Sequence, residues 1–224
     1  PKDITTLKAN PKIDEVIHLE SYQPTVTPSI LQIERLMNLL KKAEKPIVLV
    51  GGGVVAADGA EELRQFVEKY QLPTVSTLLG LGLLPQDKPY FLGMGGMHGT
   101  YAANMALMET DLLINIGSRF DDRLACSPEA FAPHAKVAHI DVDPVEIGKI
   151  IHTDIPIVGD AKVALQQMLS IEIPAPDCEE WRMVCKARQQ RYPLKYEWNE
   201  KVIKPQAVIE IIGRITEGKS YIVT

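Results

Sequence analysis

The residues of this chain best suited to bind a ligand follow a series of apolar runs. The first group is Gly51-Gly52-Gly53, and Ala56 completes the spacing G-x-G-x-x-A. Glycines at this spacing allow a tight turn and let backbone amides approach a phosphate at a helix N-terminus. A dinucleotide fingerprint also needs an acidic residue about 20 positions further on, whereas residues 77–80 are Thr-Leu-Leu-Gly. The pattern therefore disfavours NAD binding and leaves open a tight turn that binds no ligand.

A second glycine-rich group spans residues 93–99, Gly-Met-Gly-Gly-Met-His-Gly. Glycine loses more backbone entropy on folding than any other residue. Four glycines in seven residues therefore predict that a ligand or another chain presses on this backbone. His98 has no cysteine, histidine or carboxylate nearby at metal-ligand spacing, so a metal-binding or catalytic role for it is disfavoured.

The third group is residues 117–123, Gly-Ser-Arg-Phe-Asp-Asp-Arg, after the apolar run 111–116. Its two arginines and two aspartates can form a solvated ion-pair cluster, which is the common interpretation of such a charge run. Alternatively, Arg119 can stack on a flat ring or clamp a diphosphate, because it directly follows a buried strand. Its position favours this second interpretation. Arg188, by contrast, lies in a polar segment and is expected to be exposed.

Carboxylates follow two later apolar runs. Asp141 comes after the run 136–140 and can accept hydrogen bonds from ribose hydroxyls. Asp143, which is followed by proline, predicts a turn and the N-cap of a further helix. Asp160 is expected to cap the helix 161–169 and is a further candidate for a ligand contact.

Strand-like and helix-like patterns alternate along the chain, which predicts a parallel sheet with helices on both faces. In such a sheet ligands gather at the carboxyl ends of the strands. Ser29 is expected to cap the first helix. The expected strands are residues 46–50, 73–78, 111–116, 136–140 and 155–158. The expected helices are residues 30–40, 60–70, one opened by 93–99, 161–169, one over 179–201 outside the sheet, and 206–215.

Composition excludes several classes of protein. The chain has 224 residues, 46% hydrophobic and 24% charged, with a net charge of -5, which is typical of a soluble globular protein. Nucleic acid is not an expected partner, since acidic residues outnumber basic ones, and no apolar stretch is long enough for a bilayer. The three cysteines include no C-x-x-C pair, so they predict neither a disulfide framework nor a zinc site. We therefore expect a reducing compartment such as the cytoplasm.

Taken in order, four segments resemble the central domain of the acetohydroxyacid synthase (acetolactate synthase) large-subunit family. They are residues 51–53, 96–99, 117–123 and 141–144. The resemblance implies a Rossmann-like domain, doubly wound, with a mainly parallel six-stranded sheet and helices on both faces. It also implies an FAD that does no net redox chemistry. The cofactor-binding residues it implies are Gly51, Gly52, Gly53, Thr77, Leu78, Gly96, Met97, His98, Gly99, Gly117, Arg119, Asp121, Arg123, Asp141, Val142 and Asp160.

The same resemblance implies a division of the chain. Residues 1–28 would link to an upstream catalytic domain, 29–173 would form the FAD-binding domain, 174–205 would connect, and 206–224 would start a thiamine diphosphate-binding domain. Because the chain starts with proline and ends in an apolar run, we expect a fragment of a longer polypeptide.

The full enzyme would condense two pyruvates, or pyruvate with 2-oxobutyrate, in branched-chain amino-acid biosynthesis. It would use thiamine diphosphate and magnesium in its flanking catalytic domains, so this fragment alone would be inactive. A homo-oligomer with a regulatory small subunit, in the cytoplasm, is the expected assembly.

Two departures and three alternatives accompany this interpretation. Ser118 stands where the family usually has alanine and is expected to be tolerated, whereas residues 124–127 leave the contacts after Arg123 open. The chain could instead belong to a related thiamine enzyme, such as a pyruvate oxidase or glyoxylate carboligase. It could also be a ligand-free scaffold domain. A nicotinamide dehydrogenase is disfavoured by the missing acidic residue.

Overall fold

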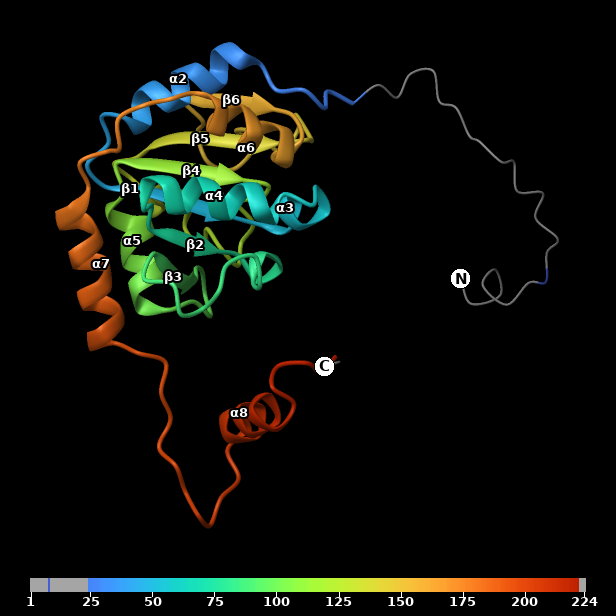
Figure 1. The fold of residues 1–224 in the computed structure, drawn as a ribbon, viewed down its shortest axis with the longest axis vertical. Coiled ribbons are helices and arrows are strands. Elements are labelled where there is room, and N and C mark those ends of the chain that lie inside the picture. Colours follow the sequence, from blue (N-terminus) through green and yellow to red (C-terminus); the bar gives the residue numbers. More distant parts are fainter. Residues whose placement is uncertain (1–7, 9–23, 222–224) are drawn as a thin grey trace.

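The computed structural model describes residue 8 and residues 24–221, and it places six strands in one sheet (Figure 1). The strand order is β3-β2-β1-β4-β5-β6, and every neighbouring pair is parallel. Most of the predicted linker 1–28 and residues 222–224 lie outside the described residues. The strands are β1 (Pro46–Val50), β2 (Thr74–Ser76), β3 (Phe91–Met94), β4 (Leu112–Ile116), β5 (Lys136–Asp141) and β6 (Ile155–Val158).

The predicted parallel sheet is confirmed, but β3 was not expected. Residues 93–99 were predicted to open a helix, whereas Gly93 and Met94 end β3 and the helix α5 (Tyr101–Glu109) begins later. Thr100 caps α5, since its side-chain oxygen accepts the N–H of Ala103 at 3.1 Å. The second expected strand, 73–78, is shorter than predicted because a single 3-10 turn, η1 (Leu78–Gly80), follows it.

The central strands are apolar because both of their faces are covered. All residues of β1 and of β4 are buried. Successive side chains point to opposite faces of a strand, so each strand contributes to two separate cores. Val48 and Ile114 belong to the core on one face of the sheet, and Leu49 and Leu113 belong to the core on the other.

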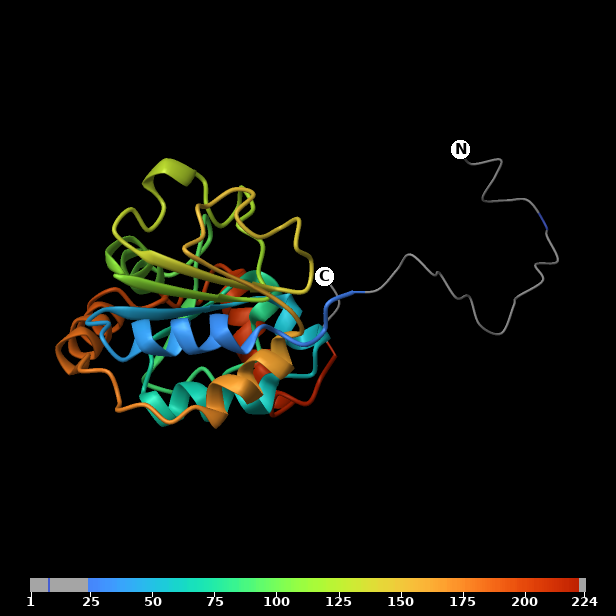
Figure 2. The same ribbon diagram turned by 90° about the horizontal axis from the view of Figure 1, so that it is seen from above.

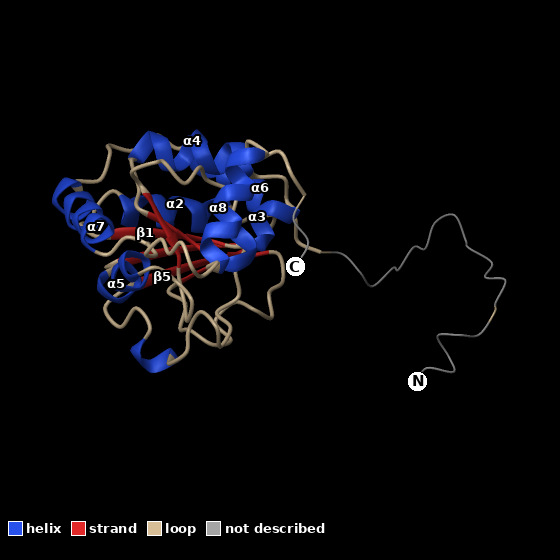
Figure 3. Ribbon diagram, turned by 90° about the horizontal axis from the view of Figure 1, so that it is seen from below, coloured by secondary structure: helices blue, strands red, loops and turns tan. Residues whose placement is uncertain are grey.

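Helices cover both faces, which makes the fold doubly wound (Figures 2 and 3). The first face carries α2 (Ile30–Leu40), α4 (Ala60–Tyr70), α6 (Ala161–Ser170) and the short α3 (Gly52–Ala56), while α5 and α7 (Glu179–Arg191) pack on the second. The predicted helices over 30–40 and 60–70 have these observed bounds. Ser29 does occupy the N-cap position of α2, but its side chain makes no capping hydrogen bond.

Helix α7 lies beside the edge strand β3 and is shorter than the predicted 179–201. Gln189 on α7 donates from Nε2 to the carbonyl oxygen of Phe91 in β3 at 2.7 Å. Arg188 was expected to be exposed, which is wrong: its side chain is only 22% exposed and binds the carboxylate of Glu109 at 2.8 Å. Trp181, also on α7, is buried and donates to the carbonyl oxygen of Pro46.

The last described helix, α8 (Pro205–Ile215), stands apart from the sheet in Figure 1. It matches the predicted helix 206–215, and Ile209 and Ile215 are exposed on its surface. No helix among residues 24–221 is both long and apolar enough to cross a membrane.

The helix predicted after Asp143 is wrong, because residues 143–150 form turns. The carboxylate of Asp143 accepts the N–H of Val145 at 2.9 Å, so the predicted turn after Asp143 is present although no helix follows it. Gly148 has a φ of +74°, outside the right-handed helical region. Val145 is 68% exposed, so this segment also lacks the buried apolar face that would stabilise a helix.

Candidate functional site

The sequence predicts a ligand site at the carboxyl ends of the strands, and the sheet has its topological switch point between β1 and β4. With this strand order, the chain connections run in opposite directions from β1 and from β4, and sheets of this kind bind ligands in a crevice at such a switch point. Gly51-Gly52-Gly53 follows β1, and Gly117 follows β4, so two of the predicted motifs meet at this crevice.

The backbones of these two motifs touch. The N–H of Gly53 donates to the carbonyl oxygen of Gly117 at 2.8 Å, and the N–H of Gly51 donates to the carbonyl oxygen of Ile116 at 3.0 Å. A Cβ on Gly51 would lie 2.4 Å from the Gly117 oxygen, and a Cβ on Gly53 would lie 2.6 Å from the Gly117 Cα. Glycine is therefore required here by the crossing of two chain segments.

The second glycine group meets the arginine segment in the same way. The N–H of Met97 donates to the carbonyl oxygen of Arg123 at 2.8 Å, and a Cβ on Gly96 would lie 2.4 Å from that oxygen. Asn104 of α5 binds both the N–H and the carbonyl oxygen of Gly96, at 2.8 and 2.9 Å. A Cβ on Gly99 would lie 2.4 Å from the carbonyl oxygen of Met94. Contacts within the chain thus account for these glycines without a ligand or another chain.

The ion-pair interpretation of residues 117–123 is wrong. Arg119, Asp121, Asp122 and Arg123 are all exposed. Within the described part of the chain, neither arginine lies within salt-bridge distance of a carboxylate. Asp121 instead accepts the N–H of Leu124 at 3.1 Å, which closes a turn. Both guanidinium groups are therefore available to a ligand at the edge of the sheet.

Asn115 fixes the start of this arginine segment and was missed in the sequence. Its side-chain amide donates to the carbonyl oxygen of Ser118 at 2.7 Å, and its Oδ1 accepts the Ser118 hydroxyl at 2.5 Å. Both residues are buried. A polar residue inside the apolar run Leu-Leu-Ile-Asn-Ile was the signal that could have revealed it. Ser118 thus adds a hydrogen bond that alanine could not make.

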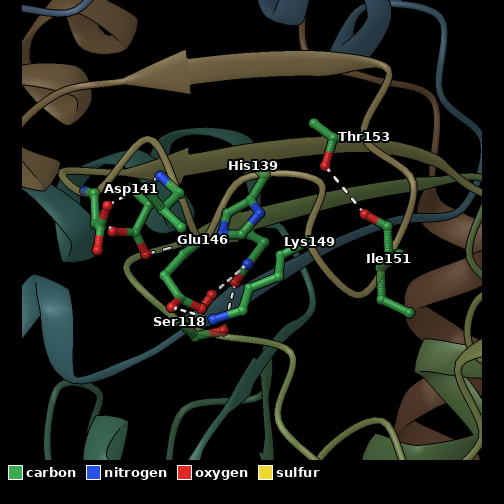
Figure 4. A network of polar contacts seen from close by, with 10 residues as sticks. Ser118, His139, Asp141, Glu146, Lys149, Ile151 and Thr153 are labelled. Carbon is green, nitrogen blue, oxygen red and sulfur yellow. Dashed lines mark hydrogen bonds and ion pairs between the residues drawn. The ribbon is translucent and has the colours of Figure 1, made fainter.

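Asp141 is the last residue of β5, which pairs with β4, and Figure 4 shows its side chain together with that of His139. Its side chain is 12% exposed, and its Oδ1 accepts the N–H of Asp143 at 2.9 Å. Burial acts to raise the pKa of Asp141, but the facing imidazole of His139 and the N–H groups of Asp143 and Val142 outweigh it. The pKa of Asp141 therefore lies below its ordinary value. The carboxylate stays ionised at neutral pH and can accept hydrogen bonds.

The remaining predicted site residues line the same edge of the sheet. Asp160 caps α6 as predicted, accepting the N–H of Val163 at 3.0 Å. Thr77 precedes η1, and His98 is exposed beyond β3. Three apolar side chains of the predicted set are largely exposed here: Leu78 (69%), Met97 (59%) and Val142 (51%). Two neighbouring side chains are also exposed, Leu79 (75%) and Val145 (68%). An apolar ligand or another protein surface would remove such side chains from water.

Three cavities lie away from this edge. One cavity, of about 620 Å³ and with a mostly apolar lining, lies between α8 and the segment 196–204. Two others, of about 210 and 580 Å³, lie beside α7. Among residues 24–221 no three histidine, cysteine or acidic side chains form a group that could hold a metal ion.

Comparison with known proteins shows the family to which the chain belongs. The profile of the family "Thiamine pyrophosphate enzyme, central domain" matches residues 33–168, more than half of the chain. The chain is 44% identical over 224 residues to the acetolactate synthase large subunit of Lactococcus lactis subsp. lactis, covering 100% of this chain and 39% of that protein. It is 42% identical over 214 residues to the acetolactate synthase isozyme 3 large subunit of Escherichia coli, covering 93% of this chain and 37% of that protein. A probable acetolactate synthase large subunit of Methanocaldococcus jannaschii is 42% identical over 216 residues. The chain thus spans about two fifths of the length of these relatives.

Proposed function

The chain belongs to the thiamine pyrophosphate enzyme central-domain family, and on that premise we propose that it is the FAD-binding central domain of an acetolactate synthase large subunit. The cofactor assignment depends most on Arg119 and Arg123, beside the crevice between β1 and β4. Within the described residues, neither guanidinium group forms a salt bridge. They are the groups at this edge that can neutralise a diphosphate.

The glycine turn contributes less charge than its spacing suggests. The N–H groups of Gly51 and Gly53 already donate to the carbonyl oxygens of Ile116, the last residue of β4, and of Gly117. The helix α3 that follows has only five residues, so its dipole is small. Arginine side chains must therefore supply most of the attraction for a diphosphate, and the glycines serve mainly to let the two loops cross.

The other groups at the edge suit the two ends of an extended FAD. The ionised carboxylate of Asp141 can accept hydrogen bonds from the hydroxyls of a ribose. The exposed side chains of Leu78 and Met97 can pack against the flat face of the isoalloxazine ring. In the proposed enzyme the flavin performs no net redox step, so these residues would bind and orient it without moving electrons.

The proposed activity belongs to the longer protein. There, flanking domains would hold thiamine diphosphate and magnesium and would condense two pyruvates, or pyruvate with 2-oxobutyrate. Residues 29–173 would supply the FAD site and the framework between those domains. A cytoplasmic homo-oligomer with a regulatory small subunit is part of the same proposal.

A ligand-free scaffold is the second candidate, because contacts within the chain explain the glycines at the edge. Titration with FAD separates the two functions. Quenching of flavin fluorescence should saturate with this chain and with the full-length protein, and more tightly with the latter, since neighbouring domains would bury part of the flavin. Absence of saturable binding to both proteins would favour the scaffold. Equal affinity would contradict a site shared with other domains.

A further inference from the structure

His139 is a buried polar side chain without a polar partner. It lies in β5, two residues before Asp141, and its side chain is 0% exposed. Within the described residues, neither Nδ1 nor Nε2 makes a hydrogen bond. Buried polar groups in folded proteins are nearly always hydrogen-bonded, so an exception of this kind needs an explanation.

The ring is held so that one nitrogen faces Asp141. Its Nε2 lies 3.8 Å from Oδ2 of Asp141 (Figure 4). Phe120 packs edge-to-face against the imidazole, with ring centroids 5.1 Å apart and an interplanar angle of 73°. Glu146 and Lys149, which Figure 4 also shows, pair with each other at 2.9 Å. Among the described residues, Asp141 carries the one carboxylate within 4.0 Å of an imidazole nitrogen of His139.

We propose that His139 is a positioning residue that fixes the Asp141 carboxylate for the adenosine ribose of the bound nucleotide. This inference rests on the proposed FAD site. Oδ1 of Asp141 accepts the N–H of Asp143. The carboxylate can turn about this hydrogen bond, and such a turn moves Oδ2. A movement of about 1 Å would bring Nε2 within hydrogen-bond distance of Oδ2. The carboxylate would then be held from two sides, with its remaining lone pairs directed at the ligand.

Two substitutions of His139 distinguish a role as hydrogen-bond donor from a role in packing alone. His139→Phe keeps a ring against Phe120 and removes both nitrogens. His139→Gln removes the ring but keeps an N–H donor of similar reach. His134→Phe is the matched control, because His134 is exposed and lies before β5, whereas Asp141 is at the other end of that strand.

The readout is the dissociation constant of FAD compared with that of FMN, which lacks the adenosine monophosphate half of FAD. We expect His139→Phe to weaken FAD binding about tenfold, the effect of losing one hydrogen bond to a charged group. FMN binding should change less than about twofold, and His139→Gln should restore most of the FAD affinity. Equal weakening of FAD and FMN, or no weakening of either, would overturn the positioning role.

A ligand-free measurement keeps this test separate from the test of FAD binding. Failure of both the unmodified chain and the full-length protein to bind FAD would contradict the proposed function. The link between His139 and Asp141 is then measured by urea unfolding of His139→Phe, Asp141→Asn and the double variant. A smaller midpoint shift for Asp141→Asn in the His139→Phe background would support the link. Additive shifts would overturn it.

Discussion

The backbone N–H of Gly53 donates a 2.8 Å hydrogen bond to the carbonyl oxygen of Gly117, which joins the turn after β1 to the turn after β4. Gly117 has a φ of +61°, a conformation that favours glycine. The two central strands of the sheet are thus held together beyond their last paired residues. Any side chain at this crossing has to push the two loops apart.

Gly53→Ala should therefore destabilise the fold. Its Cβ would meet backbone atoms of Gly117 at 2.6 Å, and we expect the free energy of unfolding to fall by about 1 to 3 kcal/mol. Urea unfolding followed by the fluorescence of the buried Trp181 measures this change. Gly213→Ala in α8 is the control, because no atom lies within 4 Å of its Cβ and alanine favours a helix. Equal losses in both variants would contradict the crossing as the cause.

Arg119→Ala should weaken FAD binding about tenfold to a hundredfold, because it removes a charge-assisted contact to the diphosphate. Arg35→Ala is a suitable control: Arg35 is exposed on α2, and its guanidinium binds the side chain of Gln32. Arg188 would be a poor control, since its ion pair with Glu109 links α7 to α5. Calorimetric titration compares the variants after circular dichroism shows that they are folded. Indistinguishable affinities would remove the main support for the flavin site.

The chain alone should form no acetolactate from pyruvate, magnesium and thiamine diphosphate. Thiamine chemistry needs a diphosphate-metal anchor and an activating carboxylate, which the proposal assigns to other domains. A colorimetric assay of acetoin after acid decarboxylation measures the product. Turnover above that of heat-killed protein would show that the division of labour between domains is wrong.

Stability should fall at acid pH partly through Asp154. Burial acts to raise its pKa, but the N–H of Val137 and the ammonium of Lys136, both at 2.9 Å, outweigh it, so the pKa lies below its ordinary value. A lowered folded-state pKa gives stability that is present above the unfolded-state pKa, about 3.9, and is lost as the pH falls below it. Urea midpoints between about pH 5 and pH 2 should therefore fall more steeply for the unmodified chain than for Asp154→Asn. The exposed Asp122, changed to Asn, serves as the control. Parallel pH profiles for the unmodified chain and Asp154→Asn would contradict this role.

The three cysteines should react with a thiol reagent at very different rates. Cys126 is exposed, whereas Cys178 and Cys185 are 2% and 1% exposed. Burial raises the pKa of the Cys185 thiol to about 12, and it also raises that of Cys178. Since the thiolate is the reactive form, one thiol should react quickly in the folded chain and all three in denaturant. Cys126→Ser should abolish the fast phase. A fast phase that survived this change would show that α7 opens readily.

The elements that the sequence predicted well are those with an unbroken pattern. Residues 46–50 and 30–40 were expected at their observed bounds, because one is continuously apolar and the other repeats at helical spacing. β3 was missed because it has only four residues and contains Gly93, so its strand character comes from pairing with β2. Local patterns do not carry such information, since the partner lies elsewhere in the chain.

The sequence allowed us to predict which segments form the candidate site. It did not allow us to predict the contacts between those segments. The sequence placed Gly51, Gly117 and Asp141 after apolar runs, and the parallel sheet brings those ends to one edge. It could not show that Gly53 touches Gly117, because that contact depends on β1 and β4 being neighbours. The roles of buried polar residues such as His139 depend on the same packing.

The hydrogen bond from Gln189 to the carbonyl oxygen of Phe91 has a consequence for self-association. β3 is an edge strand, and unpaired backbone groups along such an edge can recruit a strand from another molecule. With Gln189 bound to this carbonyl and α7 packed beside the strand, one docking point for a foreign strand is occupied. Helix α7 therefore covers part of the β3 edge, which opposes aggregation. It also connects the sheet to the segment that leads to α8. A chain shortened before α7 would expose this edge and the part of the second core that Trp181 covers, and would be prone to form intermolecular β-structure.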